Sequence, residues 1–133
     1  MNKYFSLERY FEELFNDLKC EDATKAYIVS LYTKYKNVSE DLSKDSITLL
    51  FAQGKEKQDF YLFQKLGDWT LFYNTCNNTY NYNTNYYRTI GQLSYYNCYK
   101  LINKKWILFQ ELADNFEYLE HQVRKKMIHP PFY

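Results

Sequence analysis

The side chains that could carry out catalysis are few and widely separated in this sequence. Three cysteines lie at Cys20, Cys76 and Cys98, and the two histidines are His121 and His129. A nucleophilic thiol needs a base beside it, and no cysteine here lies in a sequence context typical of cysteine enzymes. We therefore predict no catalytic residue, which favours a protein that is not an enzyme.

Metal and phosphate sites are not indicated either. Helical bundles hold di-iron centres through Glu-x-x-His pairs, and neither histidine has a glutamate three residues before it. Asp114, Glu117 and His121 share one helical face, a pattern more typical of a solvated surface. The three glycines are too far apart to form a phosphate-binding loop. We predict no metal site and no cofactor.

One acidic residue stands in a segment whose neighbours are typical of a protein core. Asp68 follows Gly67 and precedes Trp69. A buried carboxylate needs hydrogen-bond partners, and we expect the hydroxyl of Tyr86 or Tyr87 to supply one. The alternative is a small-molecule binder or enzyme whose pocket lies near Asp68, Trp69, Tyr86 and Tyr87.

Composition narrows the class of protein. The 133 residues carry 17 basic and 16 acidic side chains, a formal net charge of +1, which argues against nucleic-acid binding and leaves it as a further alternative. No apolar run reaches the roughly 20 residues that cross a bilayer, and the N-terminus does not resemble a signal peptide. An odd number of cysteines suits a reducing compartment. We expect a cytoplasmic protein without membrane contact.

Hydrophobic spacing predicts an all-α fold, a single-domain bundle of about six helices over residues 1–133. Apolar residues recur three and four positions apart, and the chain has only three glycines and two prolines for tight turns. In the second helix, Ala23 and Ala26 fall on the expected buried face. The expected helices cover about 6–19, 22–36, 45–54, 55–73, 84–102 and 103–129.

Several residues are placed to begin or end these helices. Ser6, Asp22 and Asn103 are suitable N-caps for the first, second and last helix. Gly54 is expected to stop the short third helix. The last helix is predicted to be long and uninterrupted, with Trp106 on its apolar face.

A line of small residues runs along the expected helix 84–102. Gly91, Ser94 and Cys98 are spaced at i, i+3 and i+7. Small side chains let a second helix approach closely, and Gly67 is the expected counterpart. We predict close helix packing at these four positions.

Aromatic residues make up 21% of the chain, and 16 of them are tyrosines. Many tyrosines fall on helical core stripes, but asparagine and tyrosine dominate a stretch at about 74–84, which predicts a polar loop. Tyr80 and Tyr82 in this stretch are candidate interaction residues, because tyrosine offers rigid amphipathic contact area. The alternative is a solvent loop that reflects AT-rich coding.

The sequence ends in a short proline-containing tail at 129–133. Pro130, Pro131, Phe132 and Tyr133 match the Pro-Pro-x-Tyr pattern that resembles a WW-domain ligand. Such a segment is pre-extended and binds an aromatic groove at small entropic cost. The alternative is a tail that folds back on the bundle.

Three short stretches are similar to a group of uncharacterised helical bacterial proteins. FQKLGDWTLF at 63–72, YYRTIG at 86–91 and FQELADNF at 109–116 follow the pattern LGD-x-x-LF … YY-x-x-x-G … F-x-x-LA-x-x-F. The resemblance covers about the C-terminal half of the chain. It implies a cytoplasmic bacterial helical protein and supplies no activity.

These features favour a protein that acts through protein–protein contacts, self-association included. An aromatic content this high is difficult to bury completely in 133 residues, and exposed apolar patches commonly mark contact surfaces. We therefore expect a protein partner or a second copy, with a small molecule as the alternative.

Overall fold

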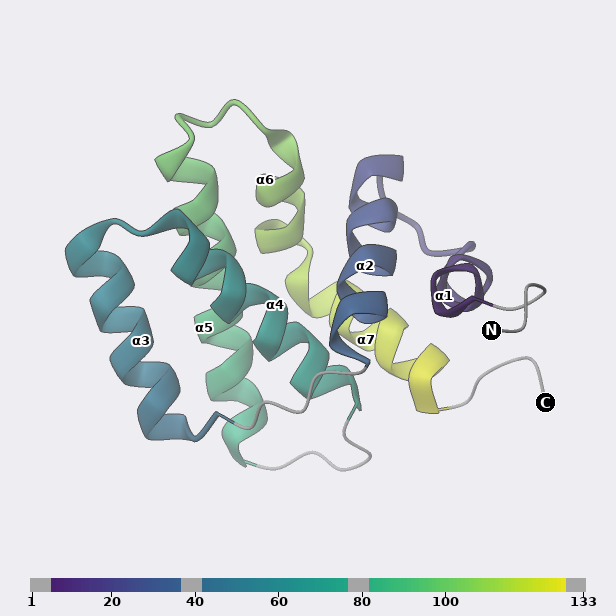
Figure 1. The fold of residues 1–133 in the computed structure, drawn as a ribbon, viewed down its shortest axis with the longest axis horizontal. Helices are drawn as coiled ribbons and strands as arrows, with labels where there is room; N and C mark the ends of the chain where they lie inside the picture. Colours follow the sequence, from purple (N-terminus) through teal and green to yellow (C-terminus); the bar gives the residue numbers. More distant parts are fainter. Residues whose placement is uncertain (1–5, 37–41, 77–81, 129–133) are drawn as a thin grey trace.

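The fold is known from a computed structural model that describes residues 6–36, 42–76 and 82–128 (Figure 1). Within these ranges the chain forms seven helices and no strand, so the predicted all-α class is confirmed and the number of helices is one higher than expected. The helices are α1 (Leu7–Leu14), α2 (Asp22–Tyr35), α3 (Lys44–Lys57), α4 (Phe60–Cys76), α5 (Tyr82–Leu101), α6 (Ile107–Asp114) and α7 (Phe116–Ile128).

Helices α4 and α5 form the centre of the fold. They pack along each other, and α4 also contacts α2, α3 and α7, while α6 packs mainly on α5. In Figure 1, α3 lies on one side of this pair and α1 lies at the opposite side, where it packs on α2. No helix in the described ranges is long and apolar enough to cross a membrane.

The predicted last helix is wrong in two respects. It is interrupted at Asn115, whose backbone leaves the helical region at φ −106° and ψ 18°, so α6 and α7 are separate helices. Its start is also later than expected, because Asn103 and Lys104 adopt left-handed conformations with φ 58° and 61°. Trp106 then precedes the helix in an extended conformation and is exposed. Asparagine tolerates both conformations because its side chain competes for backbone hydrogen bonds.

Several of the remaining helix ends also differ from expectation: α1 ends at Leu14 and not near 19, and α4 begins at Phe60 and not near 55. Ser6 caps α1 as predicted, since its hydroxyl accepts from the Arg9 N–H at 3.1 Å. Asp22, however, is the first residue of α2 and not its cap. Gly54 lies inside α3, which continues to Lys57 and ends at Gln58 with φ 51°.

The predicted loop at 74–84 is shorter than expected. Helix α4 continues to Cys76 and α5 begins at Tyr82, so only 77–81 separates them, and these residues lie outside the described ranges. Asn74 and Thr84 are buried, and the Asn74 Nδ2 donates to the Thr84 carbonyl at 3.1 Å. The two ends of this stretch therefore belong to the helical core.

The small residues lie where α4, α5 and α7 approach one another. Gly67 of α4 faces the ring of Tyr95, and a Cβ at this glycine would lie 2.6 Å from that ring. Gly91 of α5 faces Thr70 and Phe116 in the same way, so a methyl group there would also collide. Ser94 is fully buried.

Cys98 is fully buried as well, and its sulfur lies 3.6 Å from the Phe60 carbonyl oxygen. Gly67 thus meets a tyrosine ring and not the small residues of α5.

Replacing Gly67 with alanine should destabilise the fold. Overpacking costs about 1–3 kcal/mol, which exceeds the roughly 1 kcal/mol that alanine gains over glycine in a helix. We expect Gly67→Ala to lower the free energy of unfolding by up to about 2 kcal/mol in urea titrations. Gly54→Ala is the control, because its Cβ would lie 3.1 Å from the Phe63 ring edge, a less severe approach than the 2.6 Å at Gly67. Equal losses for the two variants would contradict this packing.

Candidate functional site

The Asp68 carboxylate joins three helices in the core. Asp68 lies on α4 and is 8% exposed. Its Oδ1 accepts a hydrogen bond from the Tyr27 hydroxyl of α2 at 2.7 Å and another from the Tyr95 hydroxyl of α5 at 2.6 Å. Gln64, one turn earlier on α4, donates its Nε2 to the Tyr27 oxygen at 3.0 Å. We call Asp68, Tyr27, Tyr95 and Gln64 the Asp68 network.

The tyrosines that reach Asp68 are not the expected pair. The Tyr86 hydroxyl is hydrogen-bonded to Thr48 of α3, and the Tyr87 ring packs edge-on against Trp69 with centroids 5.5 Å apart. Successive residues of a helix point about 100° apart, so Asp68 and Trp69 face different neighbours. The structure therefore separates Asp68 from the three aromatic residues predicted to line a pocket with it.

The sequence pattern placed many tyrosines on core stripes but singled out neither Tyr27 nor Tyr95 as a partner of Asp68. The signal that could have identified both is a tyrosine at a core position, whose hydroxyl must find a polar partner.

Burial decides the electrostatics of the Asp68 network. Removal from water raises the pKa of Asp68 to about 6, and the hydrogen bonds from Tyr95 and Tyr27 oppose part of that rise. Burial also raises the pKa of both tyrosines, and the neighbouring carboxylate raises it further. Both phenols therefore remain neutral donors at ordinary pH, and the arrangement is suited to holding helices together.

The three thiols are not activated. Burial is the largest cause that raises the pKa of Cys20, Cys76 and Cys98, and for Cys98 the Asp68 charge adds to it. A reactive cysteine needs a lowered pKa, because the thiolate is the nucleophile. The thiols as placed here are poor nucleophiles.

No metal-binding group is present among the residues that the structure describes. His121 lies 3.9 Å from the Glu117 carboxylate on α7. Asp114 belongs to α6, beyond the break at Asn115, so the three residues do not lie on one continuous helix as predicted.

A second buried polar cluster joins α4, α5 and α7. Glu120 of α7 is fully buried, and its Oε1 accepts from the Arg88 Nε of α5 at 2.5 Å. Arg124, one turn further along α7, donates to the Asn74 carbonyl at 3.2 Å. Nothing in the sequence pattern singled out this cluster, because charged residues are expected at the surface.

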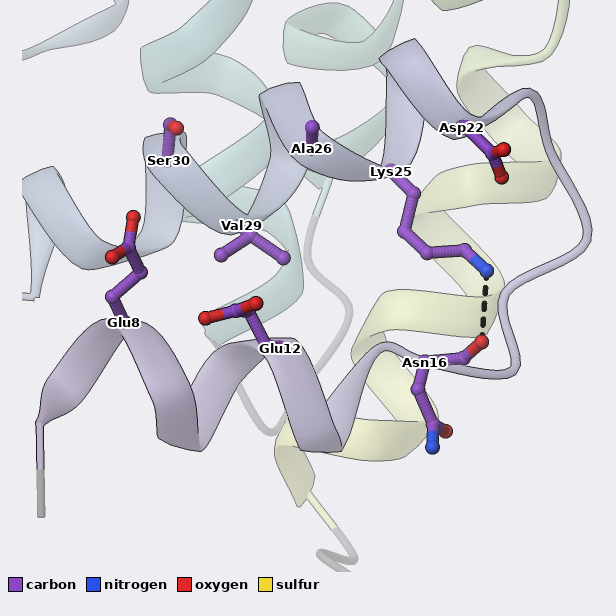
Figure 2. A pocket seen from close by; sticks show the side chains of 8 residues that line it. All are labelled: Glu8, Glu12, Asn16, Asp22, Lys25, Ala26, Val29 and Ser30. Atoms are coloured by element: carbon purple, nitrogen blue, oxygen red, sulfur yellow. Dashed lines mark hydrogen bonds between the residues drawn. The ribbon is translucent and has the colours of Figure 1, made fainter. Parts of the chain in front are cut away.

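Several cavities open at the surface of the described residues. One of about 470 Å³ lies between α1 and α2 (Figure 2). Another of about 680 Å³ lies between the start of α2 and α6, and a third of about 320 Å³ lies between the ends of α3 and α5. None of the three is lined by Asp68, Trp69, Tyr86 or Tyr87.

The remaining candidate residues lie at the ends of the described ranges or outside them. Tyr82 is the first residue of α5. Tyr80 and the tail at 129–133 lie outside the described residues.

Comparisons with known proteins identify no relative: no family model, no curated protein and no solved structure matches this chain. The similarity to helical bacterial proteins therefore stays a prediction.

Asp68 should make stability depend on pH. Its pKa is about 6 in the fold and near 3.9 in an unfolded chain, so the folded state binds the proton more tightly. Its contribution is therefore fully present below about pH 4 and is lost as the pH rises through 6. In Asp68→Asn the amide oxygen can still accept both hydroxyls, and no charge forms.

We expect the free energy of unfolding of Asp68→Asn, relative to the unmodified protein, to rise by about 2–3 kcal/mol between pH 4 and pH 7.5. Urea titrations at several pH values followed by tryptophan fluorescence would measure it. Glu56→Gln, an exposed change on α3, is the control. A difference that stays constant with pH would refute the assignment.

Glu120 should contribute more to stability than its exposed neighbour. Glu120→Ala leaves the Arg88 guanidinium without its buried carboxylate, which typically costs about 3–5 kcal/mol. Glu117→Ala removes a carboxylate that is 61% exposed and 3.9 Å from the same arginine, which should cost less than about 1 kcal/mol. Thermal and urea unfolding of both variants tests this, and similar losses would contradict it.

Proposed function

We propose that this protein acts without catalysis, as a helical protein that binds another protein. The observation that supports this is an exposed apolar pair at the start of α6. Trp106 is 53% exposed and Ile107 is 67% exposed. Ile107 also lines the cavity of about 680 Å³ between α2 and α6. Adjacent large apolar side chains beside a cavity are typical of protein contact surfaces.

The backbone holds this pair outward in a defined way. The left-handed turn at Asn103 and Lys104 precedes Trp106, whose ring then packs edge-on against Phe109 with centroids 5.4 Å apart. The buried face of α6 is formed by Leu108, Phe109, Leu112 and Ala113. Ile107 is left outside this face. A preorganised tryptophan loses little conformational freedom on binding, which is one reason that tryptophan is frequent at interface hot spots.

The polar side chains of the core also support a non-catalytic role. Asp68 is held by two tyrosine hydroxyls, and the thiols have raised pKa values. The alternative of a small-molecule pocket at Asp68 draws no support from the described cavities. We further propose a reducing, cytoplasmic setting, supported by three cysteines that are all free.

The exposed pair should be required for association. We expect Ile107→Asp to weaken binding to a partner, or self-association, by about tenfold or more. Leu49→Asp is the matched control, since Leu49 of α3 is 60% exposed and distant in sequence. Light scattering over a concentration series would detect a second copy, and quantitative affinity capture would detect another protein. A strictly monomeric protein with no captured partner would overturn the proposal, as would equal behaviour of the two variants.

A further inference from the structure

We infer that the outward face of α2 is the floor of a groove that docks a cationic amphipathic helix of a partner protein. This inference rests on the proposed function and names the chemistry of the partner. The groove includes Ile107 at one edge and is built by α1, α2 and α6.

The floor is a helix face made of small side chains. Ala23, Ala26 and Ser30 of α2 are exposed at i, i+3 and i+7, although both alanines were expected in the core. In Figure 1, α2 lies between α6 and α1. Small residues in this spacing allow a helix axis to approach to about 8–10 Å.

The two flanks of α2 are hollowed. The cavity of about 470 Å³ lies between α2 and α1, and the cavity of about 680 Å³ lies between α2 and α6. Asp22 lines both, so they meet at the start of α2. Figure 2 shows Glu8 and Glu12 rising from α1 toward α2, with Val29 pointing down from α2 to meet them. Together the cavities border a floor that extends for two turns.

The charge of the lining selects a cationic occupant. The only amine among the residues of the two linings is Lys25, whose Nζ donates to the Asn16 carbonyl at 2.8 Å. Among the described residues, no ion pair is formed by any of the acidic lining residues. The acidic lining residues are Glu8, Glu12, Glu21, Asp22, Glu111 and Asp114.

The Glu111 carboxylate has a structural role and is not available to a partner. The Glu111 carboxylate accepts from the Glu21 N–H at 3.2 Å and from the Thr24 hydroxyl. It thereby caps α2 from another helix, because Glu21 makes no side-chain cap of its own. The other five carboxylates remain available to lysine or arginine side chains.

The apolar part of the groove makes the occupant amphipathic. Ile107, which is 67% exposed, lines one flank, and the exposed methyl groups of Ala23 and Ala26 form the floor. Apolar residues of the partner would therefore face α2 while its cationic residues reach the carboxylates on both sides. A helix presents this arrangement with apolar residues at i, i+3, i+4 and i+7. A phosphate backbone would be repelled by the same carboxylates.

A synthetic peptide can test this directly. The probe is a fluorescein-labelled helical peptide of about 18 residues with leucine and alanine on one face and lysine on the other; its control has glutamate in place of lysine. We expect saturable binding of the lysine peptide by fluorescence anisotropy at low salt, weakened at about 0.5 M salt. No binding of the lysine peptide, or equal binding of the glutamate peptide, would overturn the inference.

Two variants separate docking in the groove from general attraction. Glu12→Lys should weaken binding about tenfold, and Ala26→Tyr should do the same without a change of charge, because the larger ring covers the floor. Glu56→Lys on α3 should change binding less than about twofold. Circular dichroism would verify that each variant is folded. Unchanged affinity in Ala26→Tyr would show surface attraction only and overturn the inference.

The outcomes distinguish this inference from the proposed function. If Ile107→Asp abolishes association with a protein partner while the lysine peptide does not bind, the proposed function stands and the cationic occupant is wrong. If light scattering shows dimers that Glu12→Lys disrupts, the occupant is a second copy and the inference is overturned.

Discussion

The hydrogen bonds from Tyr27 and Tyr95 to the Asp68 carboxylate are the constraint on which the arrangement of the central helices depends. The Tyr95 ring reaches Asp68 by passing over the preceding residue of α4, which is why that position is occupied by glycine. The Tyr27 hydroxyl fixes the rotation of α2 about its own axis. Ala26 directly precedes Tyr27 on the helix, so it points about 100° away from Tyr27 and is exposed. The Asp68 network thus sets the rotation of α2 that leaves Ala26 exposed.

A core rich in tyrosine needs buried polar groups that form hydrogen bonds with the tyrosine hydroxyls. Tyr32 is a second example: it is fully buried, and its hydroxyl is hydrogen-bonded to the Thr75 hydroxyl of α4. The Glu120–Arg88 pair does the equivalent between α7 and α5. Buried polar pairs add little net stability, since each group gives up water, but a missing partner costs about 1–3 kcal/mol for a neutral group and about 3–5 kcal/mol for a buried ion pair. A packing that separates the two polar partners is therefore unfavourable, whereas Leu or Phe at the same positions would accept different neighbours.

Local periodicity was enough to predict an all-α fold and the start of α1 at Ser6, because apolar spacing and capping depend on neighbours within one or two turns. Local periodicity failed where a contact between residues far apart in the sequence determines the structure. Gly54 was expected to end a helix, yet it lies inside α3 against the ring of Phe63. Asp68 and Tyr27 are 41 positions apart, and no spacing rule connects them. A stripe shows which side of a helix is buried but not which helix covers it.

The net charge of the chain likewise does not show where the fold places the charged side chains. A net charge of +1 predicts no electrostatic preference when it is spread over the whole surface. Charges act over only about 8 Å at physiological salt, so what a partner encounters is the local set of side chains. The fold brings carboxylates from α1, from the start of α2 and from α6 around one groove. The balanced total therefore conceals a locally acidic surface, and this surface is the basis of the proposed preference for a cationic protein segment over nucleic acid.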